Sequence, residues 1–248
     1  ECNLIISHHP LAFKPFKSLR GTTYIERCMI KACKHDIVIY SAHTNLDNAM
    51  GGVNFKLAEM IGLQNVRILS PQKNALLKLV TFVPEAYAEM VRNALFNAGA
   101  GSIGNYDSCS FNTVGEGTFR AHDGANPFRG EIGELHFENE VRIETIIPAY
   151  KRITVTRALR SVHPYEEPVF DYYPLNNAWE QAGSGVVGEL LEAEDELSFL
   201  QRIKDVFHVP TIKHSPLTGK MIREVALCGG SGAFLIKDAI AYGADVFI

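Results

Sequence analysis

The pattern of hydrophobic and polar positions divides the start of the chain into alternating strands and helices. Residues 2–7 and 36–42 are short, continuously apolar runs that predict strands. Apolar side chains recur at helical spacing over residues 22–34, and a second helix is expected at residues 53–61, just before Gly62. Because both strands are apolar throughout, the pattern predicts a parallel sheet that is covered on two faces.

The end of the chain repeats this order. Residues 225–228 predict a strand, residues 229–232 a glycine-rich turn, and residues 233–242 a helix, with a last strand at 245–248. Upstream of these elements, an amphipathic helix is expected at residues 197–207. Its apolar side is expected to carry Leu197, Leu200, Ile203 and Phe207.

The middle of the chain has the order β-α-β-β-α-β, which is typical of ferredoxin-like domains with an antiparallel sheet and two helices on one face. The six elements are expected at residues 76–83, 85–98, 108–120, 140–148, 150–161 and 167–175. A polar, glycine-containing stretch at residues 176–185 is expected to be the return linker. The simplest architecture is a discontinuous α/β domain with a parallel-type mixed sheet (residues 1–74 and 185–248), interrupted by an inserted α+β domain with its linker (residues 75–184).

Composition limits the class of protein and its partners. The 248 residues are 46% hydrophobic and 21% charged, as in ordinary globular proteins. No apolar run reaches the roughly 18–20 residues of a membrane-spanning helix. A net charge of -4 argues against nucleic acid as a partner. Five scattered cysteines without a CxxC pair are typical of free thiols in a reducing cytoplasm, so a cytoplasmic protein without a membrane partner is expected.

Imidazole and carboxylate side chains follow both strands near the start of the chain. His8 and His9 come directly after the first strand and before Pro10, whereas His43 and Asp47 follow the second strand. Because ligand sites form beyond the carboxyl ends of parallel strands, these side chains are expected in one pocket. Histidine and aspartate bind divalent metals, and neighbouring histidines suit two ions lying side by side. The pattern predicts a dinuclear site with His8, His9 and Asp47 as ligands.

Each of these residues also has a purely structural interpretation. His8 and His9 could be half-buried rings whose N–H groups satisfy loop carbonyls, and Asp47 could stabilise the turn at Gly51. His43 could be a ligand, a packed ring, or a residue that orients a ligand or shuttles a proton, and the last interpretation is favoured. His43 is the one weak candidate for a catalytic role.

Three protein ligands cannot hold two ions well, so further ligands are expected beyond Ile248. The chain lacks an initiator Met, begins almost inside a strand and ends within another, which predicts a fragment of a longer natural chain. The rival ligands within the chain are His163, Glu166, Glu167 and His214. The sequence around His163 is expected to begin the last strand of the inserted domain instead.

The glycine-rich segment 229–232 lies between a predicted strand and a predicted helix, where backbone amides can cradle a phosphate. It lacks the Lys-Ser/Thr of a P-loop and the spacing of a dinucleotide fingerprint, so a tight turn is favoured. Ala233 stands where a Gly-x-Ser-x-Gly motif needs glycine, which argues against Ser231 as a nucleophile. Cys228 ends a buried strand and is expected in the core.

Several short strings of chemically distinctive residues are spread along the whole chain. They are Ser7-His8-His9-Pro10, Ala42-His43-Thr44-Asn45-Leu46-Asp47, His163-Pro164-Tyr165-Glu166-Glu167-Pro168, Tyr173-Pro174-Leu175, Cys228-Gly229-Gly230-Ser231-Gly232 and Gly243-Ala244-Asp245-Val246-Phe247-Ile248. In this order and combination they resemble the Nif-three-like family, also called GTP cyclohydrolase 1 type 2 homologues. One departure lies in the turn at residues 183–188, where relatives tend to carry Leu and Arg at the positions of Ser184 and Val186. This weakens any role for a basic residue there.

The resemblance implies an α/β domain with a dinuclear metal site, to which His8, His9 and Asp47 map as ligands and which a His and a Glu beyond Ile248 complete. It also implies a PII/CutA-like inserted domain. For the full-length protein it implies a toroidal homohexamer whose metal sites face an inner cavity. Mixed imidazole and carboxylate ligation suits Zn, Fe, Mn, Co or Ni, with two ions expected per subunit.

The leading hypothesis is a cytoplasmic, divalent-metal-dependent hydrolase-like protein. Water activated by the metals would attack an electrophilic carbon or phosphorus of GTP or a related small nucleotide. GTP itself follows from the resemblance alone, because the sequence contains no recognisable purine pocket. The alternative is a non-catalytic oligomeric metal-binding protein with a regulatory or scaffold role, in which the inserted domain senses a small molecule or partner.

Overall fold

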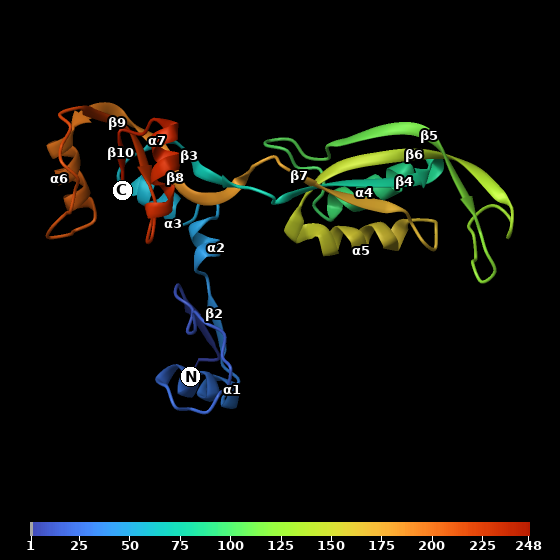
Figure 1. Cartoon of the computed structure of the whole chain (residues 1–248), viewed down its shortest axis with the longest axis horizontal. Helices are drawn as coiled ribbons and strands as arrows, with labels where there is room; N and C mark the ends of the chain where they lie inside the picture. The colour runs from blue at the N-terminus through green and yellow to red at the C-terminus, as the bar shows by residue number, and fades with distance from the viewer. Residues whose placement is uncertain (1) are drawn as a thin grey trace. The chain divides into compact units, whose positions relative to one another are not determined.

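The computed structural model describes residues 2–248 as two compact units, whose elements are labelled in Figure 1. The first unit comprises the chain up to Pro71 together with Glu180–Ile248, and the second unit is Gln72–Trp179. Both units combine helices with sheets, so the chain has the mixed α/β character that the sequence predicts. None of the described helices is long and apolar enough to cross a membrane.

The first unit is built from short strands and helices whose ends carry recognisable capping residues. Its elements are β1 (Leu4–Ser7), α1 (Tyr24–Lys34), β2 (Val38–Ser41), α2 (Thr44–Asp47), α3 (Val53–Met60), β3 (Gln64–Gln72), β8 (Trp179–Asp195), α6 (Glu196–Val206), β9 (Met221–Leu227), α7 (Ile236–Tyr242) and β10 (Val246–Phe247). The hydroxyl of Thr23 accepts a hydrogen bond from the Glu26 amide and caps α1. α7 is capped after Tyr242 by Gly243, whose φ of 90° lies in the left-handed region.

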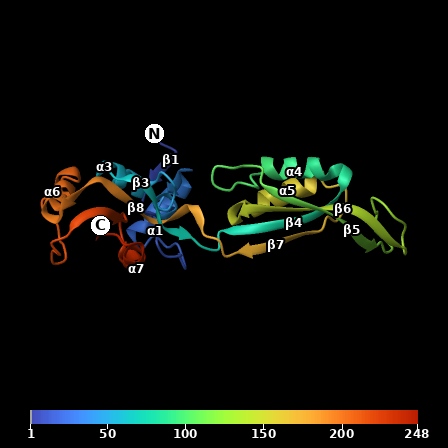
Figure 2. The same cartoon turned by 90° about the horizontal axis from the view of Figure 1, so that it is seen from above.

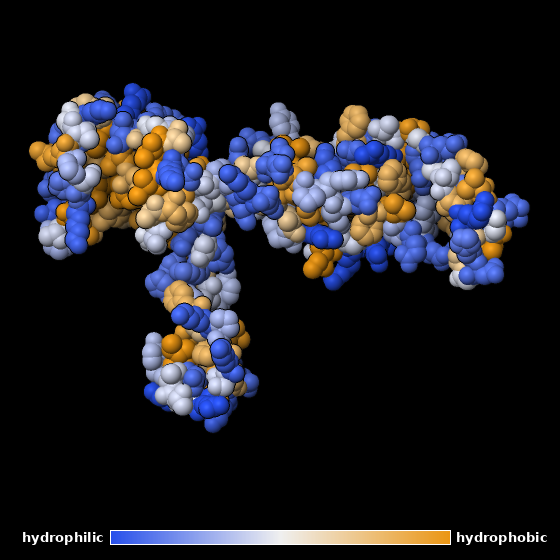
Figure 3. Space-filling model, in the orientation of Figure 1, coloured by the Kyte–Doolittle hydropathy of each residue, from blue (hydrophilic) through white to orange (hydrophobic). Residues whose placement is uncertain are grey.

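β1 and β2 form a parallel two-stranded sheet, as predicted, with Ser7 opposite Ser41. The prediction that this sheet is covered on two faces is wrong, because Ile6 is 70% exposed and Val38 is 60% exposed. Apolar side chains accordingly reach the surface in this part of the chain (Figure 3). The physical reason is that β1 and β2 pair only with each other among the described residues. A ribbon of two strands is too narrow for one helix, α1, to bury both of its faces.

A four-stranded sheet holds the core of the first unit. Its strand order is β10-β9-β8-β3, with β10 parallel to β9 and β9 antiparallel to β8. Successive strand residues point to opposite faces, so Val225 packs with α3 and α6 whereas Ala226 packs with α7. The sheet is therefore apolar on both sides and lies between helices.

Residues 176–185, which were expected to be the return linker, contain the boundary between the two units, but β8 occupies most of them, so the segment is a strand and not a loop. Gly183 and Gly185 make the segment look like a loop, but Gly183, like Gly188 further along β8, is required by strand pairing. A Cβ added at Gly188 would lie 2.8 Å from the carbonyl oxygen of Gln64, and one at Gly183 would overlap the carbonyl of Ser70. Both neighbours belong to β3, so these glycines allow the two backbones to approach closely.

The predicted amphipathic helix forms as α6, and the expected residues Ile203 and Phe207 pack in or against the core, but Leu197 does not. Leu197 is 65% exposed, whereas Phe199 is 1% exposed and packs in the core beside Ile203. The cause is the helix start, because the Asp195 carboxylate accepts hydrogen bonds from the amides of Leu197 and Ser198. This cap holds Leu197 in the first turn, where its side chain faces solvent.

The second unit has the predicted β-α-β-β-α-β order. Its elements are β4 (Leu76–Pro84), α4 (Ala88–Asn97), β5 (Ser110–Arg120), β6 (Leu135–Pro148), α5 (Arg152–Val162) and β7 (Phe170–Leu175). The strands form one antiparallel sheet in the order β5-β6-β4-β7. β6 begins five residues earlier than expected, because residues 135–139 continue the pairing with β5.

Helices α4 and α5 lie on one face of this sheet (Figure 2) and form the core with it. The buried residues include Leu79, Val83, Val91, Leu95, Val141, Ile143, Ile147, Val155 and Leu159. Alternate residues of β6, such as Glu138, Glu140 and Arg142, point to the other face, which neither helix covers.

Replacing Leu159 by Ala should lower the free energy of unfolding of the second unit by about 2–5 kcal/mol, because it leaves a cavity between α5 and the sheet. Ile153 on the same helix is 74% exposed, and Ile153→Ala should change stability by only about 0.5 kcal/mol. Urea unfolding followed by the fluorescence of Trp179, the single tryptophan, measures both variants. Equal losses in the two variants would contradict this account of the core.

Candidate metal centre

The carboxyl ends of β1 and β2 bring three histidines together. Ser7 and Ser41 end the two strands side by side, with their hydroxyl oxygens 2.9 Å apart. The Ser7 hydroxyl also donates to the carbonyl oxygen of His9 at 2.9 Å, which bends the chain back after β1. As a result, one ring nitrogen from each of His8, His9 and His43 lies within 4.8 Å of the other two.

The three imidazole rings form a triangle. The ring centroids of His8 and His9 are 4.8 Å apart, those of His8 and His43 are 5.1 Å apart, and those of His9 and His43 are 5.3 Å apart. Phe13 closes one side of the triangle, with its ring edge-on to His43 at 5.6 Å. The structure thus brings His8, His9 and His43 together, and it places His43 about as close to the other two as they are to each other.

Asp47 faces the same triangle through His8. The Nδ1 atom of His8 lies 3.1 Å from the carbonyl oxygen of Ala42, which can only accept a hydrogen bond. Nδ1 therefore carries the ring proton in neutral His8, and the lone pair of Nε2 faces the Asp47 carboxylate, 3.8 Å from Oδ1. Two acceptors that face each other at this separation leave room for a cation between them. Metal-binding histidines commonly donate their other N–H to a backbone carbonyl in this way.

A buried amide connects this site with the four-stranded sheet. Asn54, on α3, is 2% exposed, and its Nδ2 donates to the backbone carbonyl of Asp47 at 2.8 Å. Its Oδ1 accepts a hydrogen bond from the amide of Gly229 at 2.7 Å, just beyond β9. Asn54 belongs to no motif that the sequence reveals by itself. The available signal was a polar residue in the first turn of a predicted helix, at a position that the helix buries.

The glycine-rich segment after β9 forms the tight turn that the sequence favours. Gly230 has a φ of 83°, and a Cβ added at Gly232 would lie 2.8 Å from the Cβ of Cys228. Burial raises the pKa of the Cys228 thiol, and the negative charge of Asp47 raises it further. Cys228 is therefore held as the neutral thiol, which argues against a nucleophilic role, as expected.

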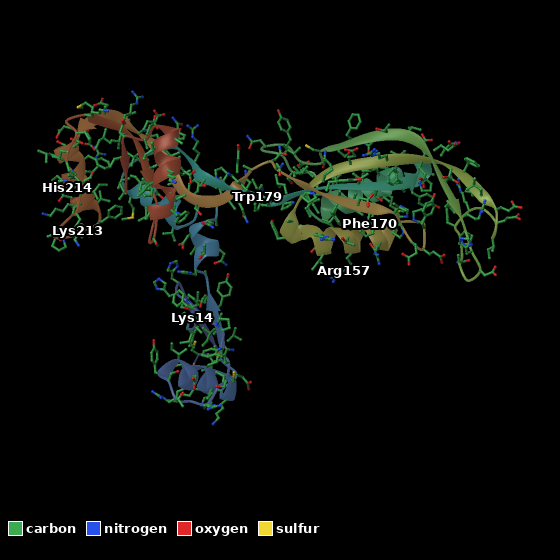
Figure 4. All side chains as sticks on the ribbon, in the orientation of Figure 1. Lys14, Arg157, Phe170, Trp179, Lys213 and His214 are labelled. Carbon is green, nitrogen blue, oxygen red and sulfur yellow. The ribbon has the colours of Figure 1, made fainter. Side chains whose placement is uncertain are left out.

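The two rival histidines have other partners. His163 is buried in the second unit, where Nε2 lies 2.9 Å from the Phe82 carbonyl oxygen and Nδ1 accepts from the Tyr165 amide at 3.1 Å. Burial lowers its pKa, so the ring is held neutral with both nitrogens engaged. His214 lies beside Lys213 in the segment after α6 (Figure 4), with Nδ1 2.7 Å from the Ser215 carbonyl oxygen. Among residues 2–248, the group that could hold an ion is His8, His9 and His43.

Asn54→Ala should expose the amide of Gly229 to exchange, because it leaves that donor and the Asp47 carbonyl without their partner. A lost buried hydrogen bond costs about 1–3 kcal/mol, so the Gly229 amide should exchange with deuterium roughly 10-fold faster or more. Asn93→Ala, at an exposed position of α4, is the matched control and should leave this rate unchanged. Unchanged exchange in Asn54→Ala would show that the amide bridge does not hold the turn.

Comparisons with known proteins agree on one family. The family model described as Duf34/NIF3 (NGG1p interacting factor 3) matches residues 1–248. A protein of Halalkalibacterium halodurans is 44% identical over 246 residues, which cover 99% of this chain and 66% of that protein. A protein of Bacillus subtilis is 42% identical over 249 residues, covering 100% and 67%. Both relatives are named GTP cyclohydrolase 1 type 2 homolog.

Solved structures give the same result. A Bacillus cereus protein related to NIF3 is 43% identical, with a TM-score of 0.79 over 99% of this chain and 65% of that structure. A Staphylococcus aureus protein is 31% identical, with a TM-score of 0.64 over 99% and 64%. The chain thus spans about two thirds of the length of the relatives that it matches. With the family match over its whole length and these identities, the chain belongs to the DUF34/NIF3 family.

Proposed function

We propose that this protein is a divalent-metal-binding, hydrolase-like protein whose ions are held by His8, His9, His43 and Asp47. The observation that carries the proposal is the geometry of His8. Its Nδ1 is hydrogen-bonded to the Ala42 carbonyl oxygen, and its Nε2 lies 3.8 Å from Oδ1 of the Asp47 carboxylate. A metal ion between these two groups would bind the lone pair of the neutral ring and an oxygen of the carboxylate.

The spacing of the histidine nitrogens supports a site for two ions. Nitrogens that bind one tetrahedral zinc at 2.0–2.1 Å lie about 3.4 Å from each other. The nitrogens of His8, His9 and His43 are spread over as much as 4.8 Å, which is wider than one ion requires. Ions in dinuclear sites are about 3.5–4 Å apart, so a second ion accommodates this spread with small side-chain rotations. The expectation of further ligands beyond Ile248 is part of this proposal.

The donor set decides which chemistry the site can support. A divalent ion bound there supplies Lewis acidity, which polarises a substrate oxygen and lowers the pKa of water. His43 has its Nδ1 3.3 Å from the hydroxyl of Thr44, which orients the ring and leaves Nε2 free to bind a metal or to hold a proton. Because the relatives are named for GTP cyclohydrolase, the proposed substrate is GTP or a related small nucleotide.

Metal binding can be tested apart from any reaction. Titration calorimetry of the metal-free protein with Zn, Mn and Co should give binding that His8→Ala weakens by at least roughly 10–100-fold, because the variant removes a ligand. His35→Ala is the matched control, since His35 is exposed just after α1 and lies outside the histidine triangle. Equal affinities in the native protein, His8→Ala and Asp47→Ala would contradict the proposed centre.

Hydrolysis of GTP is the second test. Full-length protein loaded separately with Zn, Mn, Fe or Co should convert GTP to a ring-opened product, and Asp47→Asn should reduce turnover by on the order of 100-fold or more. Chromatography of the nucleotide pool measures both. No product with any of the metals would defeat the cyclohydrolase proposal while leaving the calorimetric result for metal binding intact.

A non-catalytic oligomeric protein is the second candidate, favoured by the exposed apolar side chains beside the site. Leu4, Ile6, Val38 and Tyr40 are between 46% and 70% exposed on β1 and β2, which suits association with another copy. Replacing both His8 and His9 by Ala separates the candidates, with light scattering as the measure of assembly. Loss of turnover with the oligomer intact supports an enzyme. Loss of the oligomer in a protein without turnover supports metals that serve assembly.

A further inference from the structure

The second unit contains a pocket of about 530 Å³, within the usual size range of sites for small organic ligands. It is lined by residues from β5 and β6, from the loop between these strands, and from the segment 165–169. Strand register places Thr113, Gly115, Gly117 and Phe119 on the sheet face that also carries Glu140. The pocket therefore lies on the face of the sheet opposite α4 and α5. None of the residues that line it belongs to the proposed metal centre.

Two glycines open this face of the sheet. Gly115 lies opposite Glu140 in the β5–β6 pair, and Gly117 lies opposite Glu138. A Cβ added at Gly117 would overlap the Glu140 carboxylate, so that carboxylate lies directly over the bare glycine. A Cβ added at Gly115 would meet nothing within 4 Å, which leaves this position as open space. Glycines inside a strand commonly mark places where another group approaches the backbone.

Aromatic rings form one wall of the pocket. The ring centroid of Tyr165 lies 6.2 Å from that of Phe119 and 6.1 Å from that of Phe128. Phe128 is in turn held edge-on against Tyr87 at 5.6 Å. The Tyr165 hydroxyl donates to Oε1 of Glu140 at 2.8 Å, which fixes the carboxylate beside the rings.

The charges that line the pocket are strongly unequal. Three residues with carboxylates line it on this face, Glu140, Glu166 and Glu167, against one guanidinium, that of Arg142. Arg142 is partly neutralised, because its Nη2 lies 2.8 Å from Oε1 of Glu144. Burial and the hydrogen bond to Glu140 raise the pKa of the Tyr165 phenol, so Tyr165 adds no charge and keeps its proton as a donor.

We propose that this pocket binds a small organic cation with an apolar body, such as an aromatic amine, amidine or guanidine. The aromatic faces of Phe119 and Tyr165 attract a cation through their negative ring faces, and the apolar body of the ligand gains contact area there. The carboxylate of Glu140, oriented by Tyr165, provides a charge-assisted hydrogen bond for the cationic group. This inference is independent of the proposed metal chemistry.

Benzamidine and its neutral analogue benzamide are suitable probes, because they have nearly the same shape and differ in charge. Calorimetry with the complete protein should show benzamidine binding at least about 10-fold more tightly than benzamide. Glu140→Gln, which keeps an oxygen for the Tyr165 hydroxyl, should remove this preference without weakening benzamide. Glu85→Gln is the matched control, since Glu85 is exposed just before α4 on the helical side of the sheet, and it should leave the preference unchanged.

A second variant tests the location of the pocket without altering its charges. Gly115→Leu should block benzamidine binding by filling the open space, while urea unfolding followed by Trp179 fluorescence stays as in the native protein. Equal affinity for benzamidine and benzamide would overturn the proposal. It would also be overturned if the Glu140→Gln variant still preferred benzamidine to benzamide. A third contradicting result would be that neither probe binds and that Gly115→Leu changes the oligomer size, because a second copy of the chain would then occupy this face of the sheet.

Discussion

Parallel pairing of β1 with β2 is the constraint on which the candidate centre depends. The register that sets Ser7 opposite Ser41 makes both strands end at the same level. The residues that follow each strand must then turn in the same place, which brings His8 and His9 against His43. A shift by one residue would reverse the faces of the strand side chains and move the two strand ends apart. The chemistry of the site is therefore set by a backbone ladder of four residue pairs.

The location of the candidate site was predictable because it follows from topology. Two apolar strands with polar residues at their carboxyl ends predict a shared edge, and the structure places His8, His9 and His43 there. The contribution of Asn54 could not be predicted in the same way. Its two hydrogen bonds join residues that are 7 and 175 positions away in the chain. Such a bridge depends on the tertiary arrangement, which no local pattern encodes.

The fold divides into predictable and unpredictable parts for similar reasons. The second unit follows the expected order, because each strand and helix has a clear period and a clear boundary. The start of β8 was not predicted, because Gly183 and Gly188 lower the local strand propensity. The structure explains both glycines by the close approach of the β3 backbone. The exposure of β1 and β2 was also hidden, because an apolar run indicates a preference for burial and says nothing about which elements supply the cover.

The dual role of Asn54 restricts which side chains can stand at that position. A carboxylate of the same shape accepts from the Gly229 amide but cannot donate to the Asp47 carbonyl, and an aliphatic side chain does neither. A glutamine has both groups but one extra methylene, which a site that is 2% exposed has no room to fold away. The side chain at position 54 therefore needs this length, with a donor for the Asp47 carbonyl and an acceptor for the Gly229 amide. The isosteric change to aspartate would set two acceptors against each other at the Asp47 carbonyl and so alter the distance between the aspartate loop and the glycine turn.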